Sequence, residues 1–94
     1  MVRHVILWKF KDDCKEEGRE FLRRLKALDG VIPEILRMEV AENEGSQDNY
    51  DACLISDFAD FEALERYRVH PLHQEVSRFC QGIRVSRTCV DYEV

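Results

Sequence analysis

The sequence predicts a single α+β domain with the element order β-α-β-β-α-β, which is the order of ferredoxin-like folds. Three observations lead to this prediction. Four segments alternate in hydrophobicity like strands, two carry the apolar stripe of amphipathic helices, and no linker, repeat or low-complexity segment interrupts the 94 residues. We therefore expect residues 1–94 to form one domain, with a four-stranded antiparallel sheet and both helices on one of its faces.

The first strand and the first helix are predicted near the start of the chain. Residues 2–10 alternate and are rich in β-branched and aromatic side chains, which is typical of a strand. Asp13 is the expected N-cap of the helix, and Asp29-Gly30 its expected end. Gly18 is expected to weaken the first turns by about 1 kcal/mol relative to alanine. The buried stripe of this helix is predicted to consist of Phe21, Leu22, Leu25 and Leu28.

The remaining elements follow from the same patterns. Asp60 is the expected N-cap of the second helix, Pro71 interrupts that helix, and Gly82 ends it. Strands are expected at 35–41, 49–57 and 83–94, with a polar turn at 42–48 between the first two of them.

The predicted strands are apolar on both sides, which has a consequence for assembly. The first strand places His4, Ile6, Trp8 and Phe10 on one side and Val5 and Leu7 on the other. The helices can cover only one face of the sheet. We expect a second copy of the chain to cover the other face, so that two sheets form a dimeric α/β barrel. The alternative is a small monomer with a few exposed apolar residues.

Composition excludes several classes of partner. The net charge of −5 disfavours nucleic acid and anionic membranes, which both attract basic surfaces. The longest apolar run, at 5–8, is too short to span a bilayer, and no signal peptide is expected, so we predict a cytoplasmic protein. Four widely spaced cysteines without a C-x-x-C pair indicate reduced thiols rather than a zinc site. No metal and no cofactor is predicted.

Candidate site residues concentrate in the segment from Tyr67 to His73. Histidine suits proton transfer near neutral pH, and a tyrosine hydroxyl can hold a carbonyl or enolate oxygen. The break at Pro71 could turn Tyr67 and His73 toward the same end of the sheet, although their spacing alone does not establish this. Predicted ligand-binding residues are His4, Trp8 and His70. The alternatives are that His70 only caps a helix and that Tyr67 and His4 are core residues.

Four segments resemble the stress-responsive dimeric α/β-barrel family: residues 4–11, 31–35, 90–92 and the Tyr67-x-x-His70-Pro71-x-His73 element. The resemblance covers the whole chain and implies homodimers whose two four-stranded sheets close into one barrel. The family includes a plant polyketide cyclase that performs an intramolecular aldol condensation. The resemblance therefore implies catalytic roles for Tyr67 and His73, with His4 in their pocket. Some plant members hold a magnesium ion through backbone carbonyls, around residues 29–35 here.

Three functions remain open from the sequence. The first is a homodimeric barrel protein that binds a small, partly apolar molecule in its pocket. The second is a cyclase-like or lyase-like enzyme that removes a proton next to a carbonyl, with His73 as the base and Tyr67 as the donor. The third is a stress-linked structural protein without a ligand or activity. A closed cavity that touches His4, Tyr67 and His73 would favour the first two.

Overall fold

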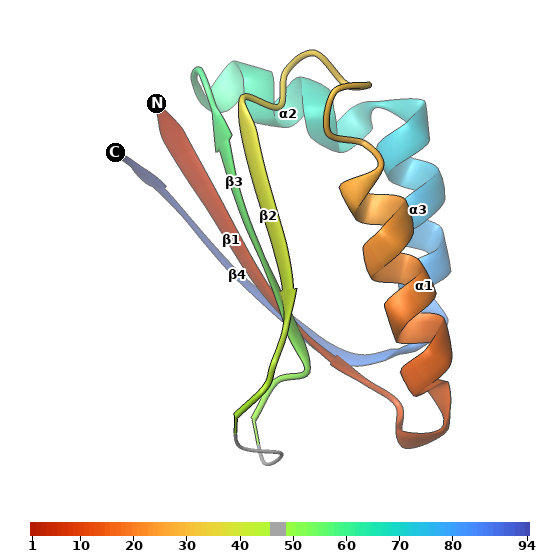
Figure 1. The fold of residues 1–94 in the computed structure, drawn as a ribbon. Helices are drawn as coiled ribbons and strands as arrows, with labels where there is room; N and C mark the ends of the chain where they lie inside the picture. Colours follow the sequence, from red (N-terminus) through yellow and green to blue (C-terminus); the bar gives the residue numbers. More distant parts are fainter. Residues whose placement is uncertain (46–48) are drawn as a thin grey trace.

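The computed structural model describes residues 1–45 and 49–94, which form an antiparallel sheet with helices on one face (Figure 1). The sheet has four strands in the order β2-β3-β1-β4, and the ferredoxin-like prediction is confirmed. The elements are β1 (Val2–Phe10), the 3-10 turn η1 (Asp12–Cys14), α1 (Lys15–Lys26), β2 (Arg37–Glu42), β3 (Ala52–Phe58), α2 (Phe61–Val69), α3 (Pro71–Gln81) and β4 (Arg84–Glu93).

The start of α1 differs from the prediction. The helix begins after η1, its N-cap is Cys14, and no side chain caps it within the described residues. Asp13 lies inside η1, one residue before the N-cap position, and accepts a hydrogen bond from the Cys14 thiol. The helix ends at Lys26, and Gly30 takes a φ of +86° in the turn beyond. The predicted turn at 42–48 lies partly outside the described residues.

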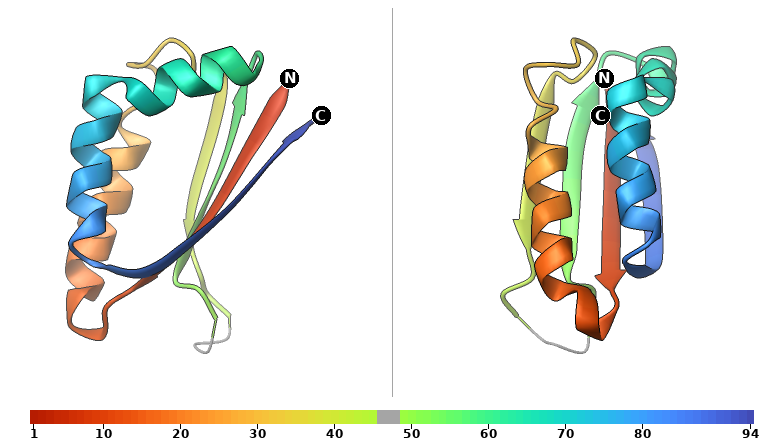
Figure 2. Two further views of the ribbon diagram at one scale, coloured as in Figure 1. Left: turned by 180° about the vertical axis from the view of Figure 1, so that it is seen from behind. Right: turned by 90° about the vertical axis from the view of Figure 1, so that its right-hand side faces the viewer.

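The predicted break at Pro71 is confirmed, and it separates α2 from α3. Asp60 caps α2 as predicted, with its carboxylate accepting from the Ala63 N–H at 2.8 Å. His70 is extended at φ −61° and ψ 132°, the conformation that a following proline favours. Because of this break, α3 lies beside α1 over the sheet while α2 crosses one end of it (Figure 2).

The hydrophobic core lies between the sheet and the helices. Along β1, every second residue is buried, beginning with Val2 and ending with Phe10, and the residues between them are partly exposed. Leu54 of β3 is fully buried on the same face, opposite Ile6. This face carries the side chains that the helices cover, and Trp8 is one of them.

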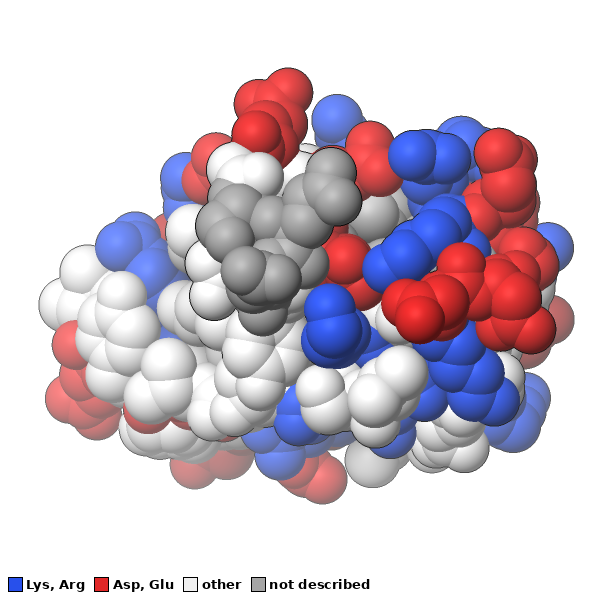
Figure 3. Space-filling view, turned by 90° about the horizontal axis from the view of Figure 1, so that it is seen from below, with Lys and Arg blue, Asp and Glu red and all other residues white. Residues whose placement is uncertain are grey.

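The other face of the sheet carries no helix (Figure 1). Its centre is formed by the laterally paired residues Val5, Leu7, Cys53, Ile55, Thr88 and Val90, which we name the open face. Val90 is 56% exposed, and the other five are also exposed or partly exposed. Figure 3 shows charged side chains crowded over the helical side and fewer of them toward the sheet side.

Two further expectations can be compared with the structure. In the described ranges, no helix has the length and apolar character needed to cross a membrane. The four cysteines are unpaired, in agreement with the prediction of free thiols: Cys14, Cys53, Cys80 and Cys89.

Candidate functional site

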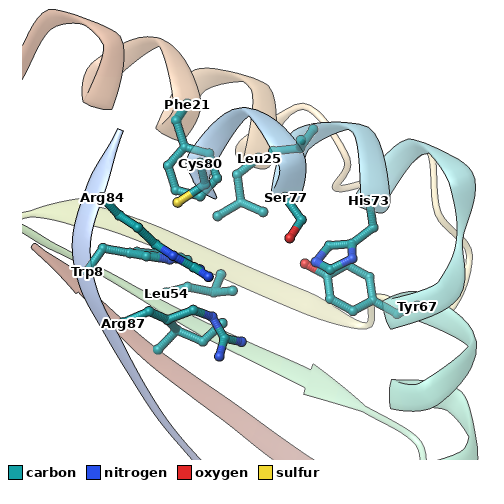
Figure 4. Close-up of a pocket in the computed structure, with 12 residues that line it drawn as sticks. Trp8, Phe21, Leu25, Leu54, Tyr67, His73, Ser77, Cys80, Arg84 and Arg87 are labelled. Carbon is teal, nitrogen blue, oxygen red and sulfur yellow. The ribbon is translucent and has the colours of Figure 1, made fainter. Parts of the chain in front are cut away.

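A cavity of about 230 Å³ lies between the sheet and the helices, with residues of α3 on one side and of β4 on the other (Figure 4). Its apolar wall consists of Ile6, Trp8, Phe21, Leu25, Leu54 and Val76. Its polar and sulfur-bearing residues are Tyr67, His73, Ser77, Cys80, Arg84 and Arg87. An apolar wall with a few convergent polar groups is the usual form of a small-molecule site.

Tyr67 contributes a hydroxyl that is buried and unpartnered. The residue is 1% exposed, and its hydroxyl oxygen has no hydrogen-bond partner among the residues that the structure describes. Burial raises the pKa of Tyr67 well above its ordinary value, so the hydroxyl keeps its proton and can donate. A buried polar group without a partner costs about 1–3 kcal/mol. An acceptor that entered the cavity could recover this free energy.

His73 faces the same cavity from α3, and its ring centroid lies 4.3 Å from that of Tyr67. Its Nδ1 lies 3.0 Å from the carbonyl oxygen of Arg68. Because a carbonyl can only accept, Nδ1 must donate, and in the neutral ring Nε2 then carries the lone pair. Burial lowers the pKa of His73, which favours the neutral ring at neutral pH. The ring is therefore suited to accept a proton at Nε2.

His4 lies behind Tyr67 rather than on the cavity wall. It is 1% exposed on β1, and its ring centroid is 6.5 Å from that of Tyr67. Its Nδ1 lies 2.5 Å from an Asp91 carboxylate oxygen, and Arg68 donates to the other oxygen at 3.0 Å. Burial lowers the pKa of His4, although Asp91 acts in the opposite direction. His4 therefore supports the Tyr67 ring and belongs to a hydrogen-bonded network with Asp91 and Arg68.

His70 has a different place from the other predicted site residues. Its Nδ1 accepts a hydrogen bond from the Leu72 N–H at 3.2 Å, so the ring caps the N-terminus of α3. It does not line the cavity. The structure thus brings Trp8, Tyr67 and His73 to one cavity, with His4 behind Tyr67 and His70 at the boundary between α2 and α3.

Sequence reasoning missed Ser77, Arg84 and Arg87, which all line the cavity. Arg87 could have been found in part, because alternation along β4 separates residues of the helix side from those of the other side. In the structure Arg87 pairs with Trp8, which lies on the helix side of the sheet. The predicted last strand contains both arginines, but the sequence does not give its register against β1. For Ser77 we find no such signal.

Metal binding has one candidate cluster in the described residues. Ligand atoms of His4, Cys89 and Asp91 lie within 4.8 Å of one another. Since Asp91 already contacts His4, Cys89 and Arg68, we assign these residues to the hydrogen-bonded network around Asp91. In the turn after α1, the Leu28 carbonyl accepts from two backbone N–H groups. A magnesium ion held by backbone carbonyls of that turn stays a prediction.

Comparison with known proteins places this geometry in a family. Residues 2–94 match the model of the stress responsive A/B barrel domain, and the chain belongs to that family. An uncharacterized Streptomyces coelicolor protein is 35% identical over 78 residues, which are 79% of this chain and 80% of that protein.

Solved structures with the same fold are also found. A dimeric protein of unknown function with a ferredoxin-like fold, from Bacteroides fragilis, has a TM-score of 0.85 and 30% identity, over 99% of this chain and 95% of that one. A hydroxynitrile lyase from Passiflora edulis has a TM-score of 0.86 at 14% identity, over 99% and 92% of the two chains. At this identity the lyase shows the fold alone.

Proposed function

We propose that this protein binds a small, partly apolar molecule in the cavity, with a ligand oxygen accepting a hydrogen bond from the Tyr67 hydroxyl. The observation that supports this most directly is that hydroxyl, which is buried on the cavity wall and has no partner among the described residues. A carbonyl or hydroxyl oxygen would supply the missing acceptor. The apolar body of the ligand would lie against Trp8 and Leu54. A structural role without a ligand would leave the cost of the buried hydroxyl unexplained.

The state of His73 favours a second function, in which the bound molecule also reacts. Tyr67 would hold a carbonyl oxygen, and Nε2 of His73 would accept a proton from the neighbouring carbon. The phenol would then stabilise the negative charge that develops on the oxygen. The hydrogen bond from His73 Nδ1 to the Arg68 carbonyl supports this role, because it keeps Nε2 free to accept. The resulting activity would be proton abstraction next to a carbonyl, as in a cyclase or a lyase.

The unit that performs this function is proposed to be a homodimer in the cytoplasm. Two copies would meet through their open faces, which carry apolar side chains such as Val5, Ile55 and Val90. The Bacteroides fragilis protein, which is 30% identical, is dimeric. The cytoplasm suits four unpaired thiols.

Ligand binding can be tested with acetophenone and ethylbenzene, which differ by the carbonyl oxygen. NMR titration should show tighter binding of acetophenone to the wild type. Tyr67→Phe should remove about 1–2 kcal/mol of that preference, or roughly 5–30-fold in affinity. Tyr92→Phe, on a residue that is 45% exposed and away from the cavity, is the matched control. An unchanged preference in Tyr67→Phe would contradict the proposal.

Proton abstraction has its own test. In D₂O the methyl group of acetophenone should exchange hydrogen for deuterium faster with the protein than without it. His73→Gln should abolish this exchange, and Tyr67→Phe should slow it. Binding without any catalysed exchange would leave the first function in place and remove the second.

A further inference from the structure

We propose that Arg84 and Arg87 form an anion-binding subsite, so that the molecule held at Tyr67 carries an acidic group, preferably a carboxylate, at its other end. This inference rests on the proposed function and adds the chemical class of the ligand. The ligand would be an oxo or hydroxy acid with an apolar body.

The position of the two arginines is set by the register of the sheet. Arg87 pairs with Trp8 and Arg84 with Phe10, whose side chains lie on the helix side of β1. Both arginines line the cavity. Figure 4 shows them extending from β4 toward the space that Tyr67, His73 and Ser77 face from the helices. A ligand between the two walls would therefore meet guanidinium groups on one side and the hydroxyl and imidazole on the other.

Neither arginine has a carboxylate partner within the described part of the chain. Most other arginines of this chain do form ion pairs: Arg3, Arg19, Arg23, Arg24, Arg37, Arg66 and Arg68. The chain has 19 acidic and 14 basic residues, so acidic partners are abundant. Two guanidinium groups without a carboxylate partner on one cavity wall are therefore unusual for this molecule. Arg84 has a hydrogen bond to the uncharged Cys80 thiol, and a guanidinium has further donors that a ligand can use.

No described carboxylate lines the cavity, so its charged wall is entirely positive. Burial raises the pKa of Tyr67 and lowers that of His73, and the charge of Arg87 acts on both groups from the opposite wall in the lowering direction. A cavity with one sign of charge and low-dielectric walls concentrates ions of the opposite sign. An anionic ligand would be attracted to this site and a cationic one repelled.

A carboxylate fits this wall better than a neutral polar group. The planar fork of a guanidinium matches the two oxygens of a carboxylate or a phosphate, and such bonds are about twice as strong as neutral ones. Leu54 lies between the arginines and Tyr67, and Trp8 lies beside the arginines in the same cavity (Figure 4). They would hold a short aromatic or aliphatic body.

Four probes can test the subsite by calorimetric titration in low salt. 4-Acetylbenzoate has the acid and the ketone, 4-acetylbenzamide lacks the charge, 4-ethylbenzoate lacks the ketone, and 4-acetylphenyl phosphate replaces the carboxylate. The wild type should bind 4-acetylbenzoate about tenfold or more tighter than the amide. Arg84→Gln and Arg87→Gln should each remove most of this preference, and Arg87→Lys should keep part of it. Arg23→Gln, at an exposed ion pair on α1, is the control.

The outcomes separate the subsite from the proposed function. Equal binding of acid and amide, or an unchanged preference in both arginine variants, overturns the subsite even if the ketone still matters. If Tyr67→Phe does not weaken the preference for 4-acetylbenzoate over 4-ethylbenzoate, the proposed hydrogen bond from Tyr67 to the ligand is contradicted, and the proposed arginine subsite is unaffected. Tighter binding of the phosphate than of the benzoate supports the subsite and assigns it to phosphate esters. If none of the four probes binds, the subsite is rejected.

Discussion

Gly18 of α1 lies directly against the ring of Phe10 in β1. A Cβ atom at Gly18 would lie 2.6 Å from Cδ2 and 2.8 Å from Cε2 of that ring. Phe10 is 3% exposed and packs against Phe21, so its ring cannot easily move. We expect Gly18→Ala to lower the free energy of unfolding by about 1–3 kcal/mol in urea titrations, because overpacking outweighs the gain in helix propensity.

The control for Gly18→Ala repeats the substitution after Phe10, its neighbour, has been replaced by a smaller residue. In a Phe10→Leu background, which removes the ring, Gly18→Ala should cost much less than in the wild type. An equal cost in both backgrounds would show that the Phe10 ring is not the cause. The expectation from sequence, that Gly18 only weakens the helix, considered propensity alone and missed this close approach.

Homodimer formation should depend on the open face. Val90→Asp places a charge on that face, at a residue that is 56% exposed, so the folded monomer should tolerate it. Sedimentation at micromolar concentration should find a dimer for the wild type and a monomer for this variant. Val31→Asp is the control, since Val31 is 57% exposed in the turn after α1. A dimer in both variants would place the interface elsewhere.

The pair of Arg3 and Asp57 predicts a dependence of stability on pH. Arg3 donates to the two oxygens of Asp57 at 2.8 and 3.1 Å and holds the pKa of that carboxyl below its ordinary value. The contribution of this pair to the free energy of unfolding is therefore present above the pKa of an unfolded aspartate, about 3.9. It is lost as the pH falls through the lower pKa of Asp57 in the folded protein. Asp57→Asn should cost about 1–3 kcal/mol at pH 7.

The cost of Asp57→Asn should shrink in denaturation curves as the pH falls below about 4, because the unfolded chain then takes up a proton at this carboxyl while the folded protein does not yet do so. Glu20 of α1 provides the comparison, since it pairs with Arg23 and Arg24 on an exposed surface. Glu20→Gln should have a smaller effect at pH 7. A cost of Asp57→Asn that is constant from pH 7 to pH 3 would contradict the prediction.

Removal of the Tyr67 hydroxyl should not destabilise the free protein. The group is buried without a partner among the described residues, so Tyr67→Phe removes an unmade hydrogen bond and keeps the ring contacts with Phe58 and His73. We expect unchanged stability or a gain of up to about 1 kcal/mol in thermal unfolding. A loss of more than about 1 kcal/mol would indicate that the hydroxyl has a structural partner.

Much of the fold could be predicted from the sequence, because the alternation, capping and proline patterns agree with the burial that the structure shows. The alternation of β1 gave its bounds and its buried face, Asp60 marked the start of α2, and Pro71 marked the break before α3. The start of α1 was missed because η1 precedes it, and a short 3-10 turn has no strong sequence signal.

The candidate site was predictable only in part. Tyr67 and His73 are neighbours because the chain turns at His70, and this turn depends on the geometry of the X-Pro unit. The positions of Arg84 and Arg87 depend on the pairing of β4 with β1, which includes a register shift between Lys9 and Phe10. Such long-range pairing cannot be obtained from local patterns.

The central position of β1 also affects how the chain folds. β1 lies between β3 and β4, and its pairing with β4 joins residues about as far apart as the chain allows, such as Val2 and Glu93. Contacts between such distant segments slow folding, because a long loop must close before they form. The cavity wall needs residues of β1, β3, β4 and the helices α1, α2 and α3, so it can be complete only after the last strand has docked. A partly folded chain would therefore expose Trp8 and lack the binding site.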